Sequence, residues 1–251
     1  MRKVLSVSIL AGCLLVMVSG CHGSGAASPA ADSRGNSAAA NGASSTDSDA
    51  EDGGRASVPA KVNQRKDDGR PLLVCFGDSL TAGLGTEQGQ SYPDYLQVEL
   101  DKLHYHYRVD NEGVSGNTTK DGVERLPEIV AMHPAVVVVE FGGNDGLRGL
   151  RIEDSRANLY EIVRTLKGAG AKVALAGITL PPDYGEDYIR QFNETYSVVA
   201  KKYKVPMLPF LLKDVYGVPG MMQRDQTHAT AKGNVIVARN VVPLVVPLLK
   251  K

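Results

Sequence analysis

The chain has 251 residues, of which 43% are hydrophobic and 22% are charged, and its formal net charge at neutral pH is zero. It contains no tryptophan and no block of basic residues, so nucleic acid is not an expected partner. The length leaves room for one sizeable α/β domain once the N-terminal segments are set aside.

Residues 1–20 have the pattern of an export signal. Arg2 and Lys3 form a charged start, and residues 4–18 form an apolar run that is too short to span a bilayer comfortably. An uncleaved N-terminal anchor helix is the alternative interpretation of this run. Its length favours a signal peptide that is removed on export.

The segment ends with Val18-Ser19-Gly20-Cys21, which resembles the lipobox of bacterial lipoproteins. The resemblance implies cleavage before Cys21 and attachment of a lipid to that cysteine, which holds a protein on a membrane surface without a spanning helix. The next residue is His22 and not aspartate. By resemblance to Gram-negative lipoproteins, this implies an exported lipoprotein of the outer membrane, on its periplasmic or its surface face.

Residues 21–69 are predicted to be a flexible tether. Between residues 23 and 57 almost no apolar side chain is larger than alanine, so this stretch cannot bury enough surface to offset the entropy of ordering. A binding tail is the less favoured alternative. We expect Cys13 to leave with the signal, Cys21 to be acylated and Cys75 to lie in a buried strand, which leaves no disulfide in the mature chain.

From residue 70 to residue 251, apolar strand-like runs alternate with helical patterns, which is typical of a single α/β domain. The expected strands are 72–76, 107–111, 135–141, 172–178 and 206–208, and the expected helices are 92–103, 120–131, 153–167, 187–203 and 231–249. The run 135–141 is too apolar for a strand with one wet face and suits the middle of a parallel sheet. We therefore predict a three-layer α/β/α sandwich with a central parallel five-stranded sheet. Its functional groups are expected at the carboxyl ends of the strands.

The motif Gly77-Asp78-Ser79-Leu80 follows the first predicted strand directly. Glycine lets the backbone turn sharply, and a serine at the strand-to-helix corner presents its hydroxyl near the positive end of the next helix. Such a serine is well placed to act as a nucleophile. On its own, however, Ser79 is as readily interpreted as a helix-capping residue.

Three further blocks supply the other parts that a serine hydrolase needs. Residues 111–118 and 141–146 follow the second and third predicted strands, and residues 225–228 precede the last helix. Acyl transfer through serine requires a base, a group that orients the base and donors for the oxyanion, and the blocks contain all three. We expect Asp78 and Asp145, which also lie in these blocks, to fix turns through backbone hydrogen bonds.

Taken together, the blocks resemble those of the GDSL or SGNH hydrolases, whose second name refers to the Ser, Gly, Asn and His of four sequence blocks. The resemblance extends from about residue 72 to the C-terminus, and it is closest to the branch of bacterial arylesterases and multifunctional thioesterase–lysophospholipases. It implies a flavodoxin-like fold, a catalytic triad and an oxyanion hole. The triad would be Ser79, Asp225 and His228, and the oxyanion donors would be the N–H groups of Ser79 and Gly116 and the side-chain amide of Asn144. The family usually has proline after the histidine, whereas Ala229 stands here, which bears on the rigidity of that loop rather than on the triad.

The same resemblance implies that the loop after the third strand moves over an acyl chain, so residues 146–151 are a candidate lid. The candidate substrate-binding residues are Leu147, Leu150, Leu180 and Pro181, for which ordinary core packing is an equally good interpretation. No cofactor is required, and no pair of histidines has the spacing of metal ligands, so no metal is expected. We expect a monomer that acts on a small acyl ester or lipid and meets the membrane only through Cys21.

The sequence thus predicts an enzyme, a serine esterase that hydrolyses carboxylic aryl or acyl esters, lysophospholipids or acyl thioesters through an acyl-serine intermediate. A first alternative is an O-acetylesterase that acts on cell-envelope polysaccharide and prefers acetyl to longer acyl groups. A second alternative is a non-catalytic envelope lipoprotein that binds a glycan or a lipid. For that protein, replacement of Ser79 by alanine would not impair function.

Overall fold

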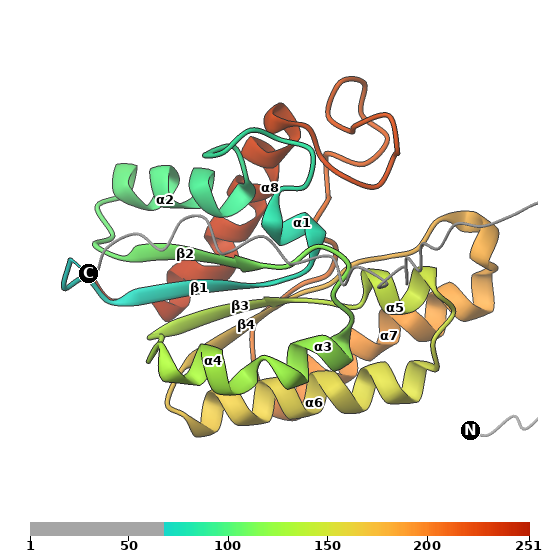
Figure 1. Cartoon of the computed structure of the whole chain (residues 1–251), viewed down its shortest axis with the longest axis horizontal. Coiled ribbons are helices and arrows are strands. Elements are labelled where there is room, and N and C mark those ends of the chain that lie inside the picture. The colour runs from blue at the N-terminus through green and yellow to red at the C-terminus, as the bar shows by residue number, and fades with distance from the viewer. Residues whose placement is uncertain (1–67) are drawn as a thin grey trace, which may run out of the picture. The chain divides into compact units, whose positions relative to one another are not determined.

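The computed structural model describes residues 68–251, so the predicted signal peptide, Cys21 and nearly all of the predicted tether lie outside the described residues. Five strands form one sheet in the order β2-β1-β3-β4-β5, and all neighbouring strands are parallel (Figure 1). The strands are β1 (Leu72–Gly77), β2 (Arg108–Gly113), β3 (Val136–Glu140), β4 (Lys172–Ala176) and β5 (Met207–Leu208). The prediction of a central parallel five-stranded sheet is confirmed.

Helices cover both faces of the sheet and complete the three layers (Figure 1). One face carries α1 (Ser79–Ala82), α2 (Tyr92–Lys102), α8 (Ala231–Val245) and the short 3₁₀ helix η2 (Val246–Leu248). The other face carries α3 (Thr119–Glu124), α4 (Leu126–Ala131), α6 (Ile152–Gly168) and α7 (Glu186–Tyr203). Near the carboxyl ends of the strands lie α5 (Gly143–Leu147) and the 3₁₀ helix η1 (Pro182–Tyr184).

The two central strands, β1 and β3, form the frame of the domain. Every residue of both strands is buried, as expected for strands that are covered by helices on both faces. Phe76 of β1 meets Phe141, which follows β3, edge to face with 4.8 Å between the ring centroids. Burial of each large apolar side chain stabilises the fold by about 1.5–3 kcal/mol. The buried ends of β1 and β3 therefore fix the position at which the following loops begin.

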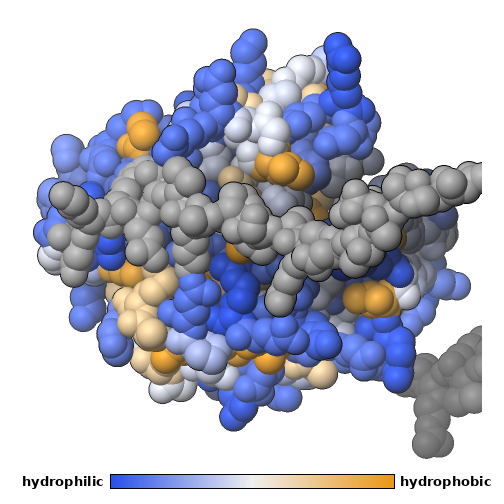
Figure 2. Space-filling model, viewed as in Figure 1, coloured by the Kyte–Doolittle hydropathy of each residue, from blue (hydrophilic) through white to orange (hydrophobic). Residues whose placement is uncertain are grey.

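The outer surface contrasts with this core. On the face shown in Figure 2, the described surface is mostly hydrophilic, and its hydrophobic residues form separate small areas. Scattered apolar residues of this kind are ordinary on a protein surface. The apolar content of residues 68–251 is thus concentrated between the layers, where the sequence pattern places it.

The predicted helix over residues 120–131 is wrong as a single element, because the structure divides it into α3 and α4 at Arg125. Pro127 has no N–H to donate, and in a continuous helix its ring would clash with the carbonyl group of Val123. Proline is tolerated in the first turn of a helix, which is where α4 places it. The last helix also ends early, at Val245, and continues only as η2.

The order of the strands determines where a site can form. β1 lies between β2 and β3, so the chain leaves β1 toward one neighbour and later returns on its other side. In open parallel sheets, ligands bind at such a reversal, in the crevice beyond the carboxyl ends of the strands. The helix after β1 begins with Ser79, and the helix after β3 contains Asn144. The topology therefore brings two of the predicted functional residues to the same crevice.

Candidate active site

Ser79 lies in a tight turn between β1 and α1. Asp78 is the N-cap of α1, and its side chain accepts a hydrogen bond of 3.0 Å from the N–H of Leu80. Gly77 leaves no room for a side chain, because a Cβ at this position would lie 2.5 Å from the carbonyl oxygen of Glu140 on the neighbouring strand. The glycine, the cap and the adjoining strand together fix the direction of the Ser79 side chain.

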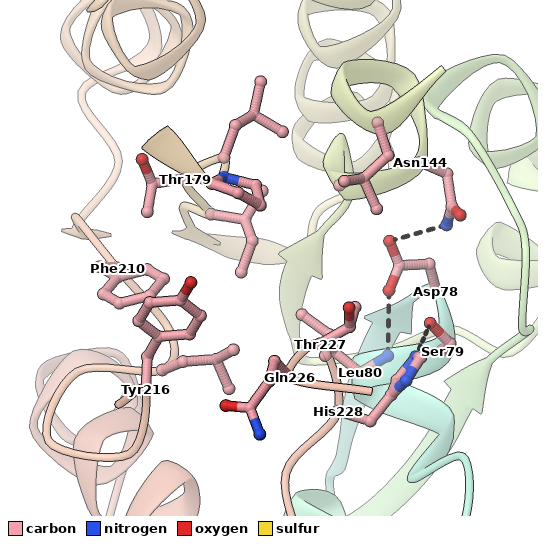
Figure 3. A pocket seen from close by; sticks show the side chains of 16 residues that line it. Asp78, Ser79, Leu80, Asn144, Thr179, Phe210, Tyr216, Gln226, Thr227 and His228 are labelled. Carbon is pink, nitrogen blue, oxygen red and sulfur yellow. Dashed lines mark hydrogen bonds between the residues drawn. The ribbon is translucent and has the colours of Figure 1, made fainter. Parts of the chain in front are cut away.

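The hydroxyl of Ser79 is the first member of a chain of hydrogen bonds. Its Oγ lies 2.8 Å from Nε2 of His228, and Nδ1 of His228 lies 2.7 Å from Oδ2 of Asp225 (Figure 3 shows the first contact). A carboxylate only accepts, so Nδ1 carries the hydrogen and Nε2 is free to accept the serine proton. The structure thus brings the three predicted triad residues together in the order that nucleophilic catalysis requires.

Asp225 is held in its ionised form by the donors around it. Burial alone would raise the pKa of its carboxyl group, but hydrogen bonds from the His228 ring and from the backbone N–H groups of His228 and Thr227 outweigh that effect. They lower the pKa of Asp225 to about 2. An ionised carboxylate at Nδ1 fixes the tautomer of the imidazole and stabilises the imidazolium that forms when Ser79 is deprotonated.

The predicted oxyanion donors lie on the other side of Ser79. The Asn144 amide nitrogen Nδ2 donates to Oδ2 of Asp78, at 3.2 Å, and to the carbonyl oxygen of Asn117, at 2.9 Å (Figure 3 shows the first). Asn144 therefore sits between the nucleophile turn and the loop that contains Gly116, which has a φ angle of +83°. Within residues 68–251, the N–H groups of Ser79 and Gly116 have no hydrogen-bond partner, which leaves them available to an oxyanion.

The two aspartates of these blocks have the structural contacts expected of them. Asp78 caps α1, as described above. Asp145 accepts hydrogen bonds of 2.9 Å from the N–H of Thr119 at the start of α3 and from the hydroxyl of Ser155 in α6. Asp145 thereby fastens α5, which carries Asn144, to two neighbouring helices.

A cavity of about 130 Å³ opens beside Ser79 and His228 (Figure 3). Half of the sixteen residues that line it are apolar: Leu80, Leu147, Ile178, Leu180, Pro181, Phe210, Leu212 and Tyr216. Three of the predicted substrate-binding residues, Leu147, Leu180 and Pro181, are among them. An apolar cavity next to a nucleophile is suited to hold the acyl part of a substrate.

The wall of the cavity formed by Phe210, Leu212 and Tyr216 is not predicted from the sequence. These residues belong to the loop that follows β5, and Phe210 and Tyr216 pack edge to face with ring centroids 6.2 Å apart. The loop has no helix and no periodic pattern that predicts which side chains point inward. Only its length and its position after a strand end could have indicated a binding loop.

Leu150 is the one predicted substrate-binding residue that does not line the cavity. Gly149 adopts a φ angle of +64°, which turns the chain away, and Leu150 is 41% exposed. The hydroxyl of Tyr188 donates to the carbonyl oxygen of Leu150 at 3.2 Å, and that of Tyr184 donates to the carbonyl oxygen of Leu147 at 3.0 Å. Two tyrosines therefore hold the candidate lid, residues 146–151, whose movement stays a prediction.

Gln223 is a further residue of the site that is not predicted from the sequence. Its Nε2 donates to the carbonyl oxygen of Leu84, at 2.7 Å, and to that of Ala229, at 2.9 Å, and its backbone N–H donates to the carbonyl oxygen of His228. The loop that carries the base is thus tied to the loop after α1. This tie restrains the backbone at Ala229, the position where the family usually has proline.

No metal site is present among residues 68–251, where no group of three His, Cys, Asp or Glu side chains is arranged to hold an ion. The polar groups around Ser79 are the imidazole, carboxylate and amide groups described above. The expectation that no cofactor is needed stays a prediction.

Comparison with known proteins agrees with this geometry. Residues 75–236 match the GDSL-like lipase/acylhydrolase family. The chain is 43% identical to Esterase TesA of Pseudomonas aeruginosa over 178 residues, which is 70% of this chain and 89% of that protein. It is 37% identical to the thioesterase 1/protease 1/lysophospholipase L1 of Escherichia coli K12 over 167 residues, 66% of this chain and 79% of that protein. A crystal structure of TesA matches with a TM-score of 0.69 at 42% identity and covers 71% of this chain and 99% of the TesA chain. The chain therefore belongs to the GDSL-like lipase/acylhydrolase family and is a hydrolytic enzyme.

Proposed function

We propose that the protein is a serine esterase that hydrolyses esters of apolar acyl groups through an acyl intermediate on Ser79. The observation that carries this proposal is the chain of hydrogen bonds from Ser79 through His228 to Asp225, which borders the apolar cavity. A serine that only caps a helix needs neither an imidazole at its hydroxyl nor a carboxylate behind that imidazole. The arrangement is that of an activated nucleophile.

In the first half of the reaction, Oγ of Ser79 attacks the carbonyl carbon of the ester while Nε2 of His228 takes the hydroxyl proton. The N–H groups of Ser79 and Gly116 stabilise the oxyanion, and the Asn144 amide joins them by giving up one of its two hydrogen bonds, to Asp78 or to Asn117. Each such donor typically lowers the barrier by about 3–4 kcal/mol. His228 then gives the proton to the departing alcohol. In the second half, water attacks the acyl-Ser79 ester by the same route and releases the acid.

The lining of the cavity defines the class of substrate. Its walls are formed mainly by leucine, isoleucine, proline and aromatic side chains, which favour an alkyl chain over a sugar or a charged group. The relatives are named esterase and thioesterase/lysophospholipase. We therefore include lysophospholipids and acyl thioesters with simple esters, since all three present an acyl carbonyl group to Ser79.

The test is hydrolysis of p-nitrophenyl esters, from acetyl to dodecanoyl, by the purified full-length chain and by Ser79→Ala. We expect wild-type activity to be highest with medium-length acyl groups and to disappear in the variant. If the rate is highest with the acetyl ester, the result would favour an O-acetylesterase of envelope polysaccharide instead. Hydrolysis that survives in Ser79→Ala would overturn the assignment of the nucleophile, and a wild-type protein that hydrolyses no ester would overturn the proposed function.

We also propose that the mature chain is an outer-membrane lipoprotein acylated on Cys21, which is supported by the lipobox-like sequence Val18-Ser19-Gly20-Cys21. The test is metabolic labelling with an alkyne-tagged palmitate in a Gram-negative host, followed by membrane fractionation. Wild-type protein and a Cys75→Ala control should carry the label, and Cys21→Ser should not. Equal labelling of Cys21→Ser, or no label on the wild type, would exclude acylation at this position.

A further inference from the structure

A buried carboxyl group that the triad does not use lies directly behind the nucleophile. Glu140 is the last residue of β3 and follows a run of valines, and its accessible surface is 0%. Burial of a carboxyl group among apolar side chains is costly unless hydrogen bonds offset it. Because burial of this carboxyl group costs free energy, we expect the hydrogen bonds of Glu140 to contribute to the site beside Ser79.

The contacts of Glu140 lie on both sides of Ser79. Its Oε2 accepts a hydrogen bond of 2.8 Å from the hydroxyl of Thr81, two residues after the nucleophile. The same oxygen accepts from the backbone N–H of Asp78, just before the nucleophile, at the longer distance of 3.5 Å. One carboxyl group of β3 thus joins the two flanks of the turn that presents Ser79.

Asp78 extends this connection to the oxyanion hole. One carboxylate oxygen of Asp78 accepts from the N–H of Leu80, and the other accepts from the Asn144 amide (Figure 3). Glu140 bonds to the backbone of Asp78, so a displacement of Glu140 also displaces the acceptor that orients Asn144. The turn of Ser79 and the amide of Asn144 are therefore both held, directly or through Asp78, by the residue at the end of β3.

The protonation of this carboxyl pair is consistent with that structural role. Burial raises the pKa of Glu140 well above its usual range, and the neighbouring Asp78 charge raises it further. Burial also raises the pKa of Asp78, to about 6, although the Leu80 N–H opposes the shift. Oε1 of Glu140 is buried and has no hydrogen-bond partner within residues 68–251, which a neutral acid tolerates far better than a carboxylate does. Glu140 is therefore the neutral member of the pair near neutral pH.

We propose that Glu140 is a positioning residue for the hydrolytic reaction, whose carboxyl group holds the Ser79 turn at Thr81 and Asp78 and, through Asp78, the Asn144 amide. This inference rests on the proposed function, because it assigns a role within the same site. It requires an acceptor oxygen at this position and not a negative charge. Glutamine supplies that oxygen, whereas leucine fills the space without it.

The experiment compares wild type, Glu140→Gln, Glu140→Leu and Thr81→Val with a matched control, Thr195→Val. Thr195 is also a buried threonine, but it lies on α7 and its hydroxyl donates to the carbonyl oxygen of Gln191. The measurements are kcat and KM with a medium-chain p-nitrophenyl ester, the rate at which a fluorophosphonate labels Ser79, and the thermal midpoint. The labelling rate reports on Ser79 whether or not the ester is a good substrate.

Because a small misplacement of reacting groups can cost about 100-fold in rate, we expect Glu140→Leu to lower kcat by about 30-fold or more with KM nearly unchanged. Glu140→Gln should keep at least about a third of kcat, and Thr81→Val should lose about fivefold, since each retains part of the hydrogen bonding. Thr195→Val should leave kcat and the labelling rate unchanged. A purely structural role would lower the thermal midpoint without this pattern in kcat.

Two results would overturn the inference. One is a folded Glu140→Leu with the kcat and labelling rate of the wild type, and the other is a Glu140→Gln that is as slow as Glu140→Leu. If Glu140→Leu does not fold, Thr81→Val serves as the test. In that case, a kcat and a labelling rate of Thr81→Val equal to those of Thr195→Val would contradict the proposal. A wild type that labels at Ser79 but hydrolyses no ester would count against the proposed function alone, because the labelling rates would still test Glu140.

Discussion

The two halves of the candidate active site are built in different ways. Ser79 and Asn144 follow central strands, and Ser79 is only 9% exposed. Asp225 and His228 lie in the long segment between β5 and α8, where the only pairing is a bridge between Met222 and Ala229, and the Asp225 side chain is 47% exposed. The nucleophile is thus held by packing and by buried hydrogen bonds, and the base mainly by hydrogen bonds within a partly exposed loop.

This difference indicates how each half can fail. Packing against two buried strands is distributed over many side chains, so no single surface substitution displaces Ser79. The base loop relies on a few contacts: Asp225 accepts from the N–H groups of Thr227 and His228, and Gln223 ties the loop to Leu84. We therefore expect single substitutions of exposed polar residues to affect the base half more than the nucleophile half.

Removal of the nucleophile should have the largest effect on kcat. This effect does not depend on which contacts hold either half of the site. Ser79→Ala is expected to lower kcat by about 10⁴-fold or more, as in other serine hydrolases that lose a triad member, with little change in thermal stability. The measurement is ester hydrolysis, with Ser197→Ala as control, because Ser197 lies on α7 and its hydroxyl donates to the carbonyl oxygen of Glu194 in the same helix. Residual activity within tenfold of the control would mean that another group performs the attack.

The second effect concerns the exposed carboxylate. Asp225→Asn can keep its backbone contacts through the amide oxygen, but it no longer stabilises the imidazolium of His228, so we expect kcat to fall by about 10²–10⁴-fold with KM little changed. Asp183→Asn, which changes another exposed carboxylate, is the matched control. If Asp225→Asn retained wild-type kcat, the hydrogen bond to His228 Nδ1 would be a structural contact without catalytic consequence.

The same contrast explains what could be predicted from the sequence. The apolar runs of β1 and β3 and the short motifs around Ser79, Asn144 and His228 are local signals, and they predict the sheet and the residues that meet at its edge. The helix break at Pro127 is also local, but its effect depends on whether packing favours one helix or two. The contacts of Glu140 cannot be predicted from the sequence alone, because they join segments that only the fold brings together.

Loss of the loop tie should produce an intermediate effect. Gln223→Ala removes the hydrogen bonds to the carbonyl oxygens of Leu84 and Ala229, and we expect the looser loop to lower kcat by about tenfold because the His228 ring is held less well. The control is Gln191→Ala, which changes an exposed glutamine of α7. A second substitution, Ala229→Pro, should restore part of the lost rate if restraint of the loop is the cause.

Loss of activity in Gln223→Ala without any rescue by Ala229→Pro would point instead to a direct effect on the cavity entrance. Gln226 and Thr227 line the cavity and belong to the same loop. A rise in KM with unchanged kcat would be the sign of that second effect, and it would weaken the division of the site into a packed half and a hydrogen-bonded half.

The smallest expected effects are on the stability of the fold. The pH dependence of stability should have opposite signs for Asp225 in the base half and Asp78 in the nucleophile half. The pKa of Asp225 is lowered to about 2, so between pH 4 and pH 2 the unfolded chain binds more protons and wild type should lose stability relative to Asp225→Asn as the pH falls. The pKa of Asp78 is raised to about 6, so between pH 4 and pH 6 the folded chain binds more protons. In that window wild type should lose stability relative to Asp78→Asn as the pH rises.

Thermal midpoints of wild type and both variants, measured from pH 2 to pH 7, test these opposite slopes. We expect a difference of about 5 °C or less for Asp78 and a smaller one for Asp225, whose exposed side chain is screened by solvent. Parallel curves for wild type and Asp78→Asn would show that the carboxyl group of Asp78 has an ordinary pKa. Asp78 would then be charged between pH 4 and pH 6, as Asp225 is, and the two halves would differ in burial alone.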